Sequence, residues 1–191
     1  THQFPKNLTA PKTIYLSPIN KNAVQYRDDI ITYLEKNPKI FFAFQPGVFE
    51  ISSGAEAFAR FYKRADIVFA NKEEYQRIFK SSDTDEKVLL EKMRAFGVKT
   101  PVLTDGINGV YALDNDKFFH LPMFPDPKPP LQRTGAGDAF ASTTTAYLTM
   151  GMNLKDAMQR GLINSAYVVQ QVGAQAGLLS KKDLESKVLH S

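Results

Sequence analysis

The sequence contains no cysteine, and this absence excludes disulfide frameworks, thiolate zinc sites and cysteine nucleophiles. Its only histidines, His2, His120 and His190, are too scattered to indicate a histidine metal site. No apolar run approaches the roughly 18 residues that a membrane-spanning helix needs. Residues 1–12 carry no apolar core of the signal-peptide kind. We therefore expect a protein that does not associate with membranes and that resides in the reducing cytoplasm.

The composition is that of a folded domain. The chain has 191 residues, of which 43% are hydrophobic and 12% aromatic, and its net charge is +4 (24 − 20). This length and composition predict a single domain over residues 1–191, with a sizeable core. The basic residues are spread along the chain, and Lys181-Lys182 is the only dense basic spot. We interpret them as a solvated surface and expect no nucleic-acid partner.

Apolar periodicity predicts strands and helices in alternation. The predicted strands are residues 13–17, 40–44, 67–70, 102–104, 110–113 and 118–121, the last two forming a hairpin around Asp114-Asn115. The predicted helices are residues 24–37, 55–64, 72–79, 84–96, 136–150 and 154–171, followed by a short tail. Alternation with short connections indicates an α/β domain with a mostly parallel sheet. Five prolines within residues 122–130 predict an extended surface crossing.

The segment from Thr134 to Phe140 (TGAGDAF) carries the most chemistry. Small residues allow backbone N–H groups to converge, and the helix that begins there leaves its first N–H groups unpaired. Together these groups form a cup for an anion, which the helix dipole reinforces. Asp138 lies in the first helical turn at the edge of this cup. An ionised carboxylate there can take the proton of an attacking hydroxyl.

Other interpretations of this segment stay open on spacing alone. A glycine turn with Asp138 as a first-turn capping residue fits equally well. A dinucleotide-binding fingerprint fits less well, because Phe140 takes the place of the third glycine and Leu131-Gln132-Arg133 is no buried strand. The P-loop pattern fails, because no Gly-Lys-Ser/Thr follows.

Two further segments follow predicted buried strands. The first, NKEE, runs from Asn71 to Glu74, and the second, TDGING, runs from Thr104 to Gly109. Asn71 and Glu74 have the spacing of a helix N-cap and its capping-box partner, and Gly106 and Gly109 also suit an ordinary hairpin. Open α/β sheets bind ligands at the carboxyl ends of their strands. We therefore expect all three segments at one rim of the sheet.

These segments, in this order, resemble the signatures of the PfkB family, the ribokinase-like carbohydrate and nucleoside kinases. TGAGDAF is similar to the family's second signature, NKEE to its Asn-x-x-Glu motif, and TDGING to its Thr-x-Gly-x-x-Gly turn. Asn164 to Gly177 (NSAYVVQQVGAQAG) resembles, more loosely, the helix and loop that flank the adenine. The resemblance covers essentially the whole chain. It implies a ribokinase-like, Rossmann-like three-layer fold with helices flanking the sheet.

The resemblance also implies an activity, the transfer of the γ-phosphate of ATP to a hydroxyl of a sugar or nucleoside with the help of magnesium. Asp138 is the implied base, and the N–H groups of Gly135, Ala136 and Gly137 are the implied anion hole. Glu74 is the implied magnesium residue, acting through water. The implied nucleotide-binding residues are Asn71, Glu74, Thr104, Gly106, Gly109, Thr134 and Asn164.

The sequence departs from the family pattern in two places. Where the family usually has an Asp that helps hold a monovalent cation, this chain has Gln132-Arg133, which puts K+ activation in doubt. We hypothesise that Arg133 supplies the missing positive charge, and a solvated loop residue is the alternative. The family's amino-terminal part, with most sugar contacts and a β lid, has no counterpart. We therefore expect a carboxyl-terminal portion that works with an amino-terminal portion or a second subunit.

Two function classes follow. The main expectation is a kinase of a sugar or nucleoside, and the alternative is a non-catalytic nucleotide-binding module or an inactive kinase fragment. A kinase of pyridoxal or hydroxymethylpyrimidine fits less well, because the full TGAGDAF run resembles the sugar branch more closely. The sequence does not specify the sugar or nucleoside.

Overall fold

The computed structural model describes residues 3–5 and 8–189, so His2 and His190 lie outside the described residues. The chain divides into two compact units. The first, here called the sheet unit, comprises Thr1–Asp105 and Tyr111–Phe119, and the second, the helical unit, comprises Gly106–Val110 and His120–Ser191. None of the helices in the described part of the chain combines the length and apolarity needed to cross a bilayer.

Six strands form one sheet, and their order across the sheet is their order in the chain. They are β1 (Thr13–Leu16), β2 (Phe41–Phe44), β3 (Ile67–Asn71), β4 (Thr100–Thr104), β5 (Val110–Asp114) and β6 (Lys117–Leu121). β1 to β4 pair in parallel, so the helices between them cross over from one end of the sheet to the other. The predicted α/β class with a mostly parallel sheet is confirmed.

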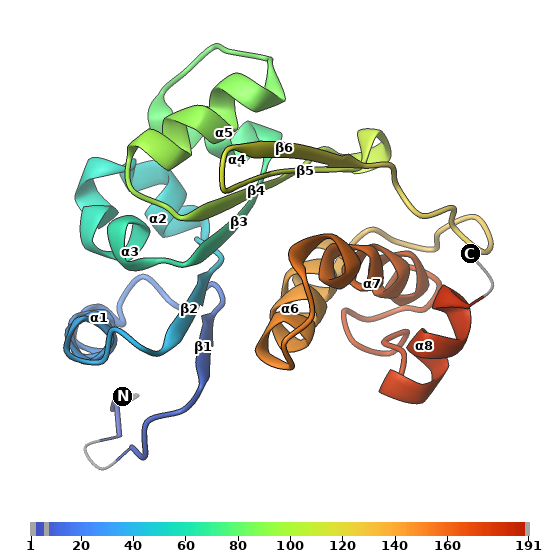
Figure 1. The fold of residues 1–191 in the computed structure, drawn as a ribbon, viewed down its shortest axis with the longest axis horizontal. Coiled ribbons are helices and arrows are strands. Elements are labelled where there is room, and N and C mark those ends of the chain that lie inside the picture. The colour runs from blue at the N-terminus through green and yellow to red at the C-terminus, as the bar shows by residue number, and fades with distance from the viewer. Residues whose placement is uncertain (1–2, 6–7, 190–191) are drawn as a thin grey trace. The chain divides into compact units, whose positions relative to one another are not determined.

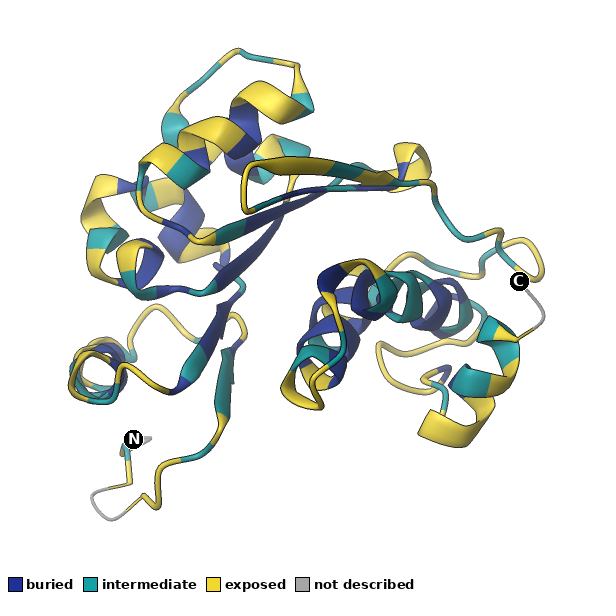
Figure 2. Ribbon diagram, viewed as in Figure 1, coloured by how far each residue is buried: buried dark blue, intermediate teal, exposed yellow. Residues whose placement is uncertain are grey.

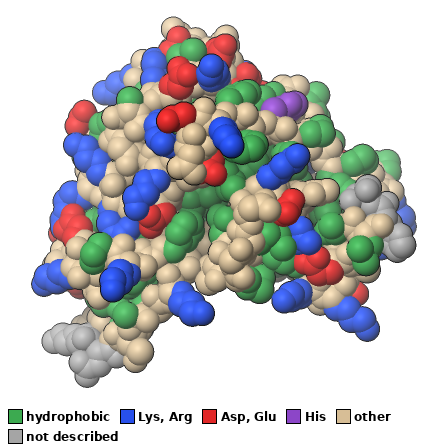
Figure 3. Space-filling model, viewed as in Figure 1, with side chains coloured by type: hydrophobic (Ala, Val, Ile, Leu, Met, Phe, Trp, Pro, Cys, Tyr) green, Lys and Arg blue, Asp and Glu red, His purple; other side chains and the backbone are tan. Residues whose placement is uncertain are grey.

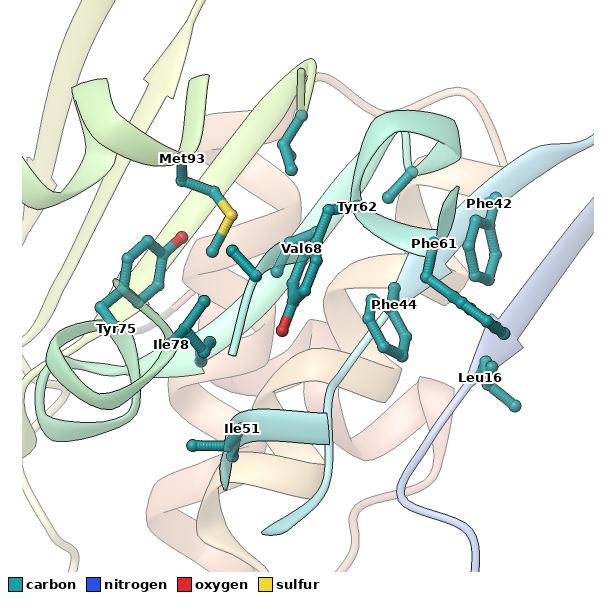
Figure 4. Packing of buried hydrophobic residues seen from close by; sticks show 14 of the residues in the cluster. Leu16, Phe42, Phe44, Ile51, Phe61, Tyr62, Val68, Tyr75, Ile78 and Met93 are labelled. Atoms are coloured by element: carbon teal, nitrogen blue, oxygen red, sulfur yellow. The ribbon is translucent and has the colours of Figure 1, made fainter. Parts of the chain in front are cut away.

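The crossover helices of the sheet unit lie on the same side of the sheet (Figure 1). They are α1 (Val24–Lys36), α2 (Val48–Ser53), α3 (Ala59–Arg64), α4 (Lys72–Phe79) and α5 (Glu86–Ala95). Their apolar sides and β2, β3 and β4 form one buried cluster (Figures 2 and 4). Within it, the ring centroid of Phe44 lies 5.5 Å from those of both Phe61 and Tyr62. Each such fully buried aromatic side chain contributes about 1.5–3 kcal/mol to folding.

The predicted helix 55–64 is a 3-10 helix, Glu56–Phe58, followed by α3, and the predicted helix 154–171 ends at Val168. Two further helices were not predicted. α2 was not predicted, because its amino-terminal cap is Gly47, which has no side chain. The Glu50 carboxylate instead accepts the Gly47 N–H at 3.0 Å. α8 (Lys181–Val188) falls in the segment that the sequence predicted as a short tail. The overlooked signal is Ser180, whose side chain accepts the Asp183 N–H at 3.2 Å as a helix cap.

A buried ion pair connects the loops that follow β1 and β2. Arg27 donates to Glu50 at 2.7 Å, and both side chains are at most 6% exposed. The same guanidinium donates to the carbonyls of Ile19, Asn20 and Lys21, at 3.0 to 3.2 Å. Its donors are therefore largely satisfied within the protein, as a buried charge requires. The pair fixes both loops at the carboxyl end of the sheet.

The helical unit is built on the close packing of α6 (Ala136–Thr149) and α7 (Leu154–Val168). A Cβ atom at Gly161 would lie 2.4 Å from Thr144 Oγ1 and 2.8 Å from the Phe140 carbonyl oxygen. Only glycine allows this approach of the two backbones. The proline-dense stretch forms neither helix nor strand. Leu131, which follows it, donates its N–H to the Val169 carbonyl just after α7, at 2.9 Å.

A second ion pair joins α8 to α7. Arg160 donates to both carboxylate oxygens of Glu185, at 2.9 and 2.7 Å, and its guanidinium lies 5.3 Å from the ring centroid of Tyr147. The hydrogen bonds from Arg160 lower the pKa of Glu185 from its ordinary value to about 2. The ionised carboxylate therefore stabilises the attachment of α8.

Breaking a buried ion pair of the sheet unit should lower the free energy of unfolding more than breaking an exposed one. Arg27→Met leaves a buried carboxylate unpaired, and we expect a loss of about 3–5 kcal/mol in the free energy of unfolding. Arg60→Met is the matched control, because Arg60 pairs with Glu35 at 2.7 Å on the surface, and it should cost about 0–1 kcal/mol. Urea unfolding measures both, and equal losses would contradict the assigned role of Arg27.

The depressed pKa of Glu185 predicts how acid acts on the helical unit. Stabilisation by Arg160 is complete above the ordinary carboxyl pKa of 4.5 and is lost as the pH falls from there through about 2. Calorimetric unfolding between pH 6 and pH 2.5 should show a steeper loss of thermal stability in the wild type than in Glu185→Gln. Glu91→Gln, which alters an exposed pair with Lys87, should follow the wild type. Equal slopes in the wild type and Glu185→Gln would refute this prediction.

Candidate functional site

The carboxyl end of β3 brings two predicted residues into one arrangement. Asn71 is the last residue of β3 and the cap of α4. Its Oδ1 accepts the Glu74 N–H at 2.9 Å, and Glu74 Oε2 accepts the Asn71 N–H at 2.8 Å. The capping box that the spacing allowed is therefore present. Asn71 also lies opposite Thr104 in the register of β3 with β4, so the structure places these predicted residues together at the carboxyl edge of the sheet.

The chemistry of this edge suits a hydrated cation. Magnesium prefers carboxylate and amide oxygens and keeps several of its own waters. A carboxylate has about four lone-pair positions, so Glu74 can serve as a capping residue and still accept a hydrogen bond from metal-bound water. No cluster of three or more His, Cys, Asp or Glu that could hold a metal occurs within residues 3–5 and 8–189. The water-mediated contact of Glu74 with magnesium stays a prediction.

The amino terminus of α6 lacks a side-chain cap, as do those of α1, α2 and α3. In four helices a cap side chain accepts an N–H of the first turn, and these caps are Asn71, Asp85, Asn153 and Ser180. The cap of α6 is Gly135, in the left-handed conformation (φ 87°), and no side chain caps this helix. Its first N–H groups are thus not occupied by a cap side chain. The left-handed glycine cap is compatible with the predicted anion cup, which stays a prediction.

The two glycines of the cup have different surroundings. A Cβ atom at Gly135 would lie 2.7 Å from the carbonyl oxygen of Ala174, whereas a Cβ atom at Gly137 would meet nothing within 4 Å. Gly137 is also exposed. The Ala136 N–H is partly engaged, because it donates to the Arg133 carbonyl at 3.3 Å.

Asp138 is exposed in the first turn of α6. Its backbone carbonyl accepts a hydrogen bond from Ser142 Oγ at 2.6 Å, which reinforces this turn. The preceding Thr134 is also exposed. Asp138 is therefore outside the core, and its contact with a substrate hydroxyl stays a prediction.

Asn164 is held entirely inside the helical unit. It is 6% exposed, its Nδ2 donates to Thr143 Oγ1 at 2.8 Å, and its Oδ1 accepts the Leu179 N–H at 2.9 Å. The amide thus connects α7 to α6 and to the loop after α7. The predicted contact between Asn164 and a nucleotide stays a prediction, and what the geometry provides is support for this loop.

The remaining predicted residues lie in turns. Gly106 and Gly109 have φ values of 51° and 90°, and a Cβ atom at Gly109 would lie 2.2 Å from the Leu121 carbonyl oxygen. A larger residue at position 109 would therefore clash with the neighbouring backbone, whereas a Cβ atom at Gly106 would meet nothing within 4 Å. Arg133 donates to Asp126 Oδ2 at 3.0 Å. This ion pair offsets part of the positive charge that our hypothesis assigned to Arg133.

On the face drawn in Figure 3, Lys and Arg side chains are interspersed with Asp and Glu. Mixed charges of this kind are typical of a solvated surface. The expectation that the chain binds no nucleic acid stays a prediction.

Comparison with known proteins identifies relatives. Residues 28–182 match the model of the pfkB family of carbohydrate kinases. The chain is 27% identical over 162 residues to an ATP-dependent 6-phosphofructokinase of Thermoanaerobacterium thermosaccharolyticum, an alignment that covers 82% of this chain and 49% of that protein. It is 31% identical over 111 residues to a cytidine kinase of Thermococcus kodakarensis, covering 58% of this chain and 39% of that protein.

Solved structures show the same fold. A candidate ribokinase II of E. coli, solved in complex with ATP and Mg2+, superposes with a TM-score of 0.80 at 18% identity, covering 94% of this chain and 59% of that one. The chain thus spans about half the length of the curated relatives it matches, 49% of the phosphofructokinase and 39% of the cytidine kinase. The ribokinase-like fold is confirmed, and the chain belongs to the pfkB family of carbohydrate kinases.

Proposed function

We propose that this chain is the carboxyl-terminal, nucleotide-binding portion of an ATP-dependent kinase that phosphorylates a hydroxyl of a sugar or nucleoside. The observation that carries the proposal is the amino terminus of α6. Its cap is a glycine, its first turn has no side-chain cap, and Asp138 is exposed beside it. Kinases of a sugar phosphate and of a nucleoside among the relatives support the same reaction class.

In the proposed reaction, Asp138 accepts the proton of the substrate hydroxyl while its oxygen forms a bond to the γ-phosphorus. The bond from that phosphorus to the β–γ bridging oxygen breaks, and ADP leaves. The N–H groups of Gly135, Ala136 and Gly137 donate to the oxygens of the transferred group. Because phosphoryl transfer depends mainly on positioning and charge neutralisation, these amides contribute alongside the base.

The proposal gives the other predicted residues binding roles. Asn71 and Glu74 serve the nucleotide phosphates, Glu74 through metal-bound water, and magnesium, when bound, neutralises phosphate charge. Thr104, Gly106 and Gly109 belong to the nucleotide-binding turn. Thr134 precedes the anion cup, and Asn164 supports the loop after α7 through its bond to Leu179.

A second candidate function is a nucleotide-binding module without catalysis. The observation that favours it is that Asn71, Glu74 and Asn164 have hydrogen-bond partners within the protein, so their structural roles require no catalysis. An assay with ATP and Mg2+ over a panel of sugars and nucleosides decides between the two. Phosphorylation of an acceptor supports the kinase, whereas ATP binding without turnover on any acceptor supports the module.

Replacement of the proposed base tests its role. Asp138→Asn should lower turnover by about 10²–10⁴, since this is the usual contribution of a positioned proton acceptor, and should leave ATP affinity nearly unchanged. Turnover and ATP binding are measured separately. Asp183→Asn is the matched control, because Asp183 also lies in the first turn of a helix, and its turnover should equal that of the wild type. Undiminished turnover in Asp138→Asn would remove this residue from the reaction.

A methyl group at Gly137 tests whether a phosphate approaches this backbone. Gly137→Ala meets no protein atom and should keep or raise stability, by up to about 1 kcal/mol. It should nevertheless weaken ATP binding about tenfold or more, because the added methyl occupies the space before the amides. Gly135→Ala should instead destabilise the fold, because of the Ala174 carbonyl. Thermal unfolding and ATP titration separate the two effects, and unchanged ATP affinity in a stable Gly137→Ala variant would argue against the cup.

A further inference from the structure

Lys72 occupies a position that is electrostatically unfavourable by itself. It is the first residue of α4, and the start of a helix is the positive end of the helix dipole. The structure compensates for this with two carboxylates. The ammonium forms an ion pair with Glu86 and lies 3.6 Å from Asp105 Oδ2. All three side chains are 22–23% exposed, so they are less screened than surface pairs.

The two carboxylates come from segments that meet at the carboxyl edge of the sheet. Glu86 is the first residue of α5, and Asp105 follows Thr104, the last residue of β4. Asn71 lies opposite Thr104 in the register. Lys72 and Asp105 are therefore the first residues after two neighbouring strands, β3 and β4. Their contact connects the NKEE segment to the segment that leaves β4.

The charges of this cluster do not cancel. One ammonium is set against two carboxylates, and the hydrogen bond to Glu86 raises the pKa of Lys72, so the lysine stays charged throughout the neutral range. Removal of Lys72 would leave Glu86 and Asp105 without the cation between them. Their mutual repulsion would then act on the backbone that follows Thr104.

We propose that Lys72 is a positioning residue for nucleotide binding, which acts through Asp105 to hold Thr104 and the start of the following turn against the Asn71–Glu74 capping box. This role rests on the proposed function. Lys72 contacts the two carboxylates and acts on the nucleotide only through them. Sequence spacing alone did not reveal it, because its partners lie 14 and 33 residues further along the chain.

A double-mutant cycle measured by calorimetric titration of MgATP tests this role. Lys72→Met and Asp105→Asn should each weaken MgATP binding about tenfold, which corresponds to about 1.4 kcal/mol. The double variant should also lose only about tenfold, because either change alone already breaks the contact. Lys72→Arg keeps the charge and should bind within about twofold of the wild type.

The exposed pair of Lys92 with Asp83 on the same unit provides the control. Lys92→Met should leave MgATP binding unchanged, and its melting temperature should match that of Lys72→Met within a few degrees, which separates positioning from general stability. Unchanged MgATP binding in Lys72→Met, or additive losses in the double variant, would overturn the role of Lys72 alone. A wild-type chain that binds no MgATP would overturn the proposed function and this role together.

Discussion

Every α-helix begins with N–H groups that have no partner inside the helix, and the candidate site depends on how this chain satisfies them. α4, α5, α7 and α8 use a side chain of the cap residue. α6 begins at a left-handed glycine that cannot do so. The first N–H groups of α6 therefore lack the side-chain acceptor that these four helices have, as do those of α1, α2 and α3. A phosphate group is a natural acceptor for such donors, because it carries negative charge to the positive end of the dipole.

The parallel strands supply the second constraint. Because β3 and β4 run in the same direction and in register, the two strands end at the same level, at Asn71 and Thr104. The residues that follow them are forced into proximity, and their charges must be compatible. Lys72 and Asp105 meet this requirement, while the capping box of Asn71 and Glu74 satisfies the first turn of α4. The segment from Asn71 to Glu74 thus both begins α4 and places polar groups at the edge of the sheet.

Local features of the fold could be predicted from the sequence. The apolar runs at β2 and β3 and the spacing of Asn71 and Glu74 depend on neighbouring residues only, and the structure contains these elements. Contacts between distant residues could not be predicted in this way. The pairing of Arg27 with Glu50 and the bond between Asn164 and Leu179 require the folded topology. α2 was missed for a related reason, because its cap is supplied from within the helix and not by the preceding residue.

The close approach of Ala174 to Gly135 limits which amino acids position 135 can accept. The atom nearest to a new Cβ atom at Gly135 is a backbone oxygen, and every amino acid has the same backbone. Glycine at position 174 would remove the Ala174 Cβ atom at 3.0 Å but would leave the backbone oxygen at 2.7 Å and the Cα atom at 2.9 Å. Any variant with a larger residue at 135 must reroute the loop itself, so a single compensating exchange cannot rescue it.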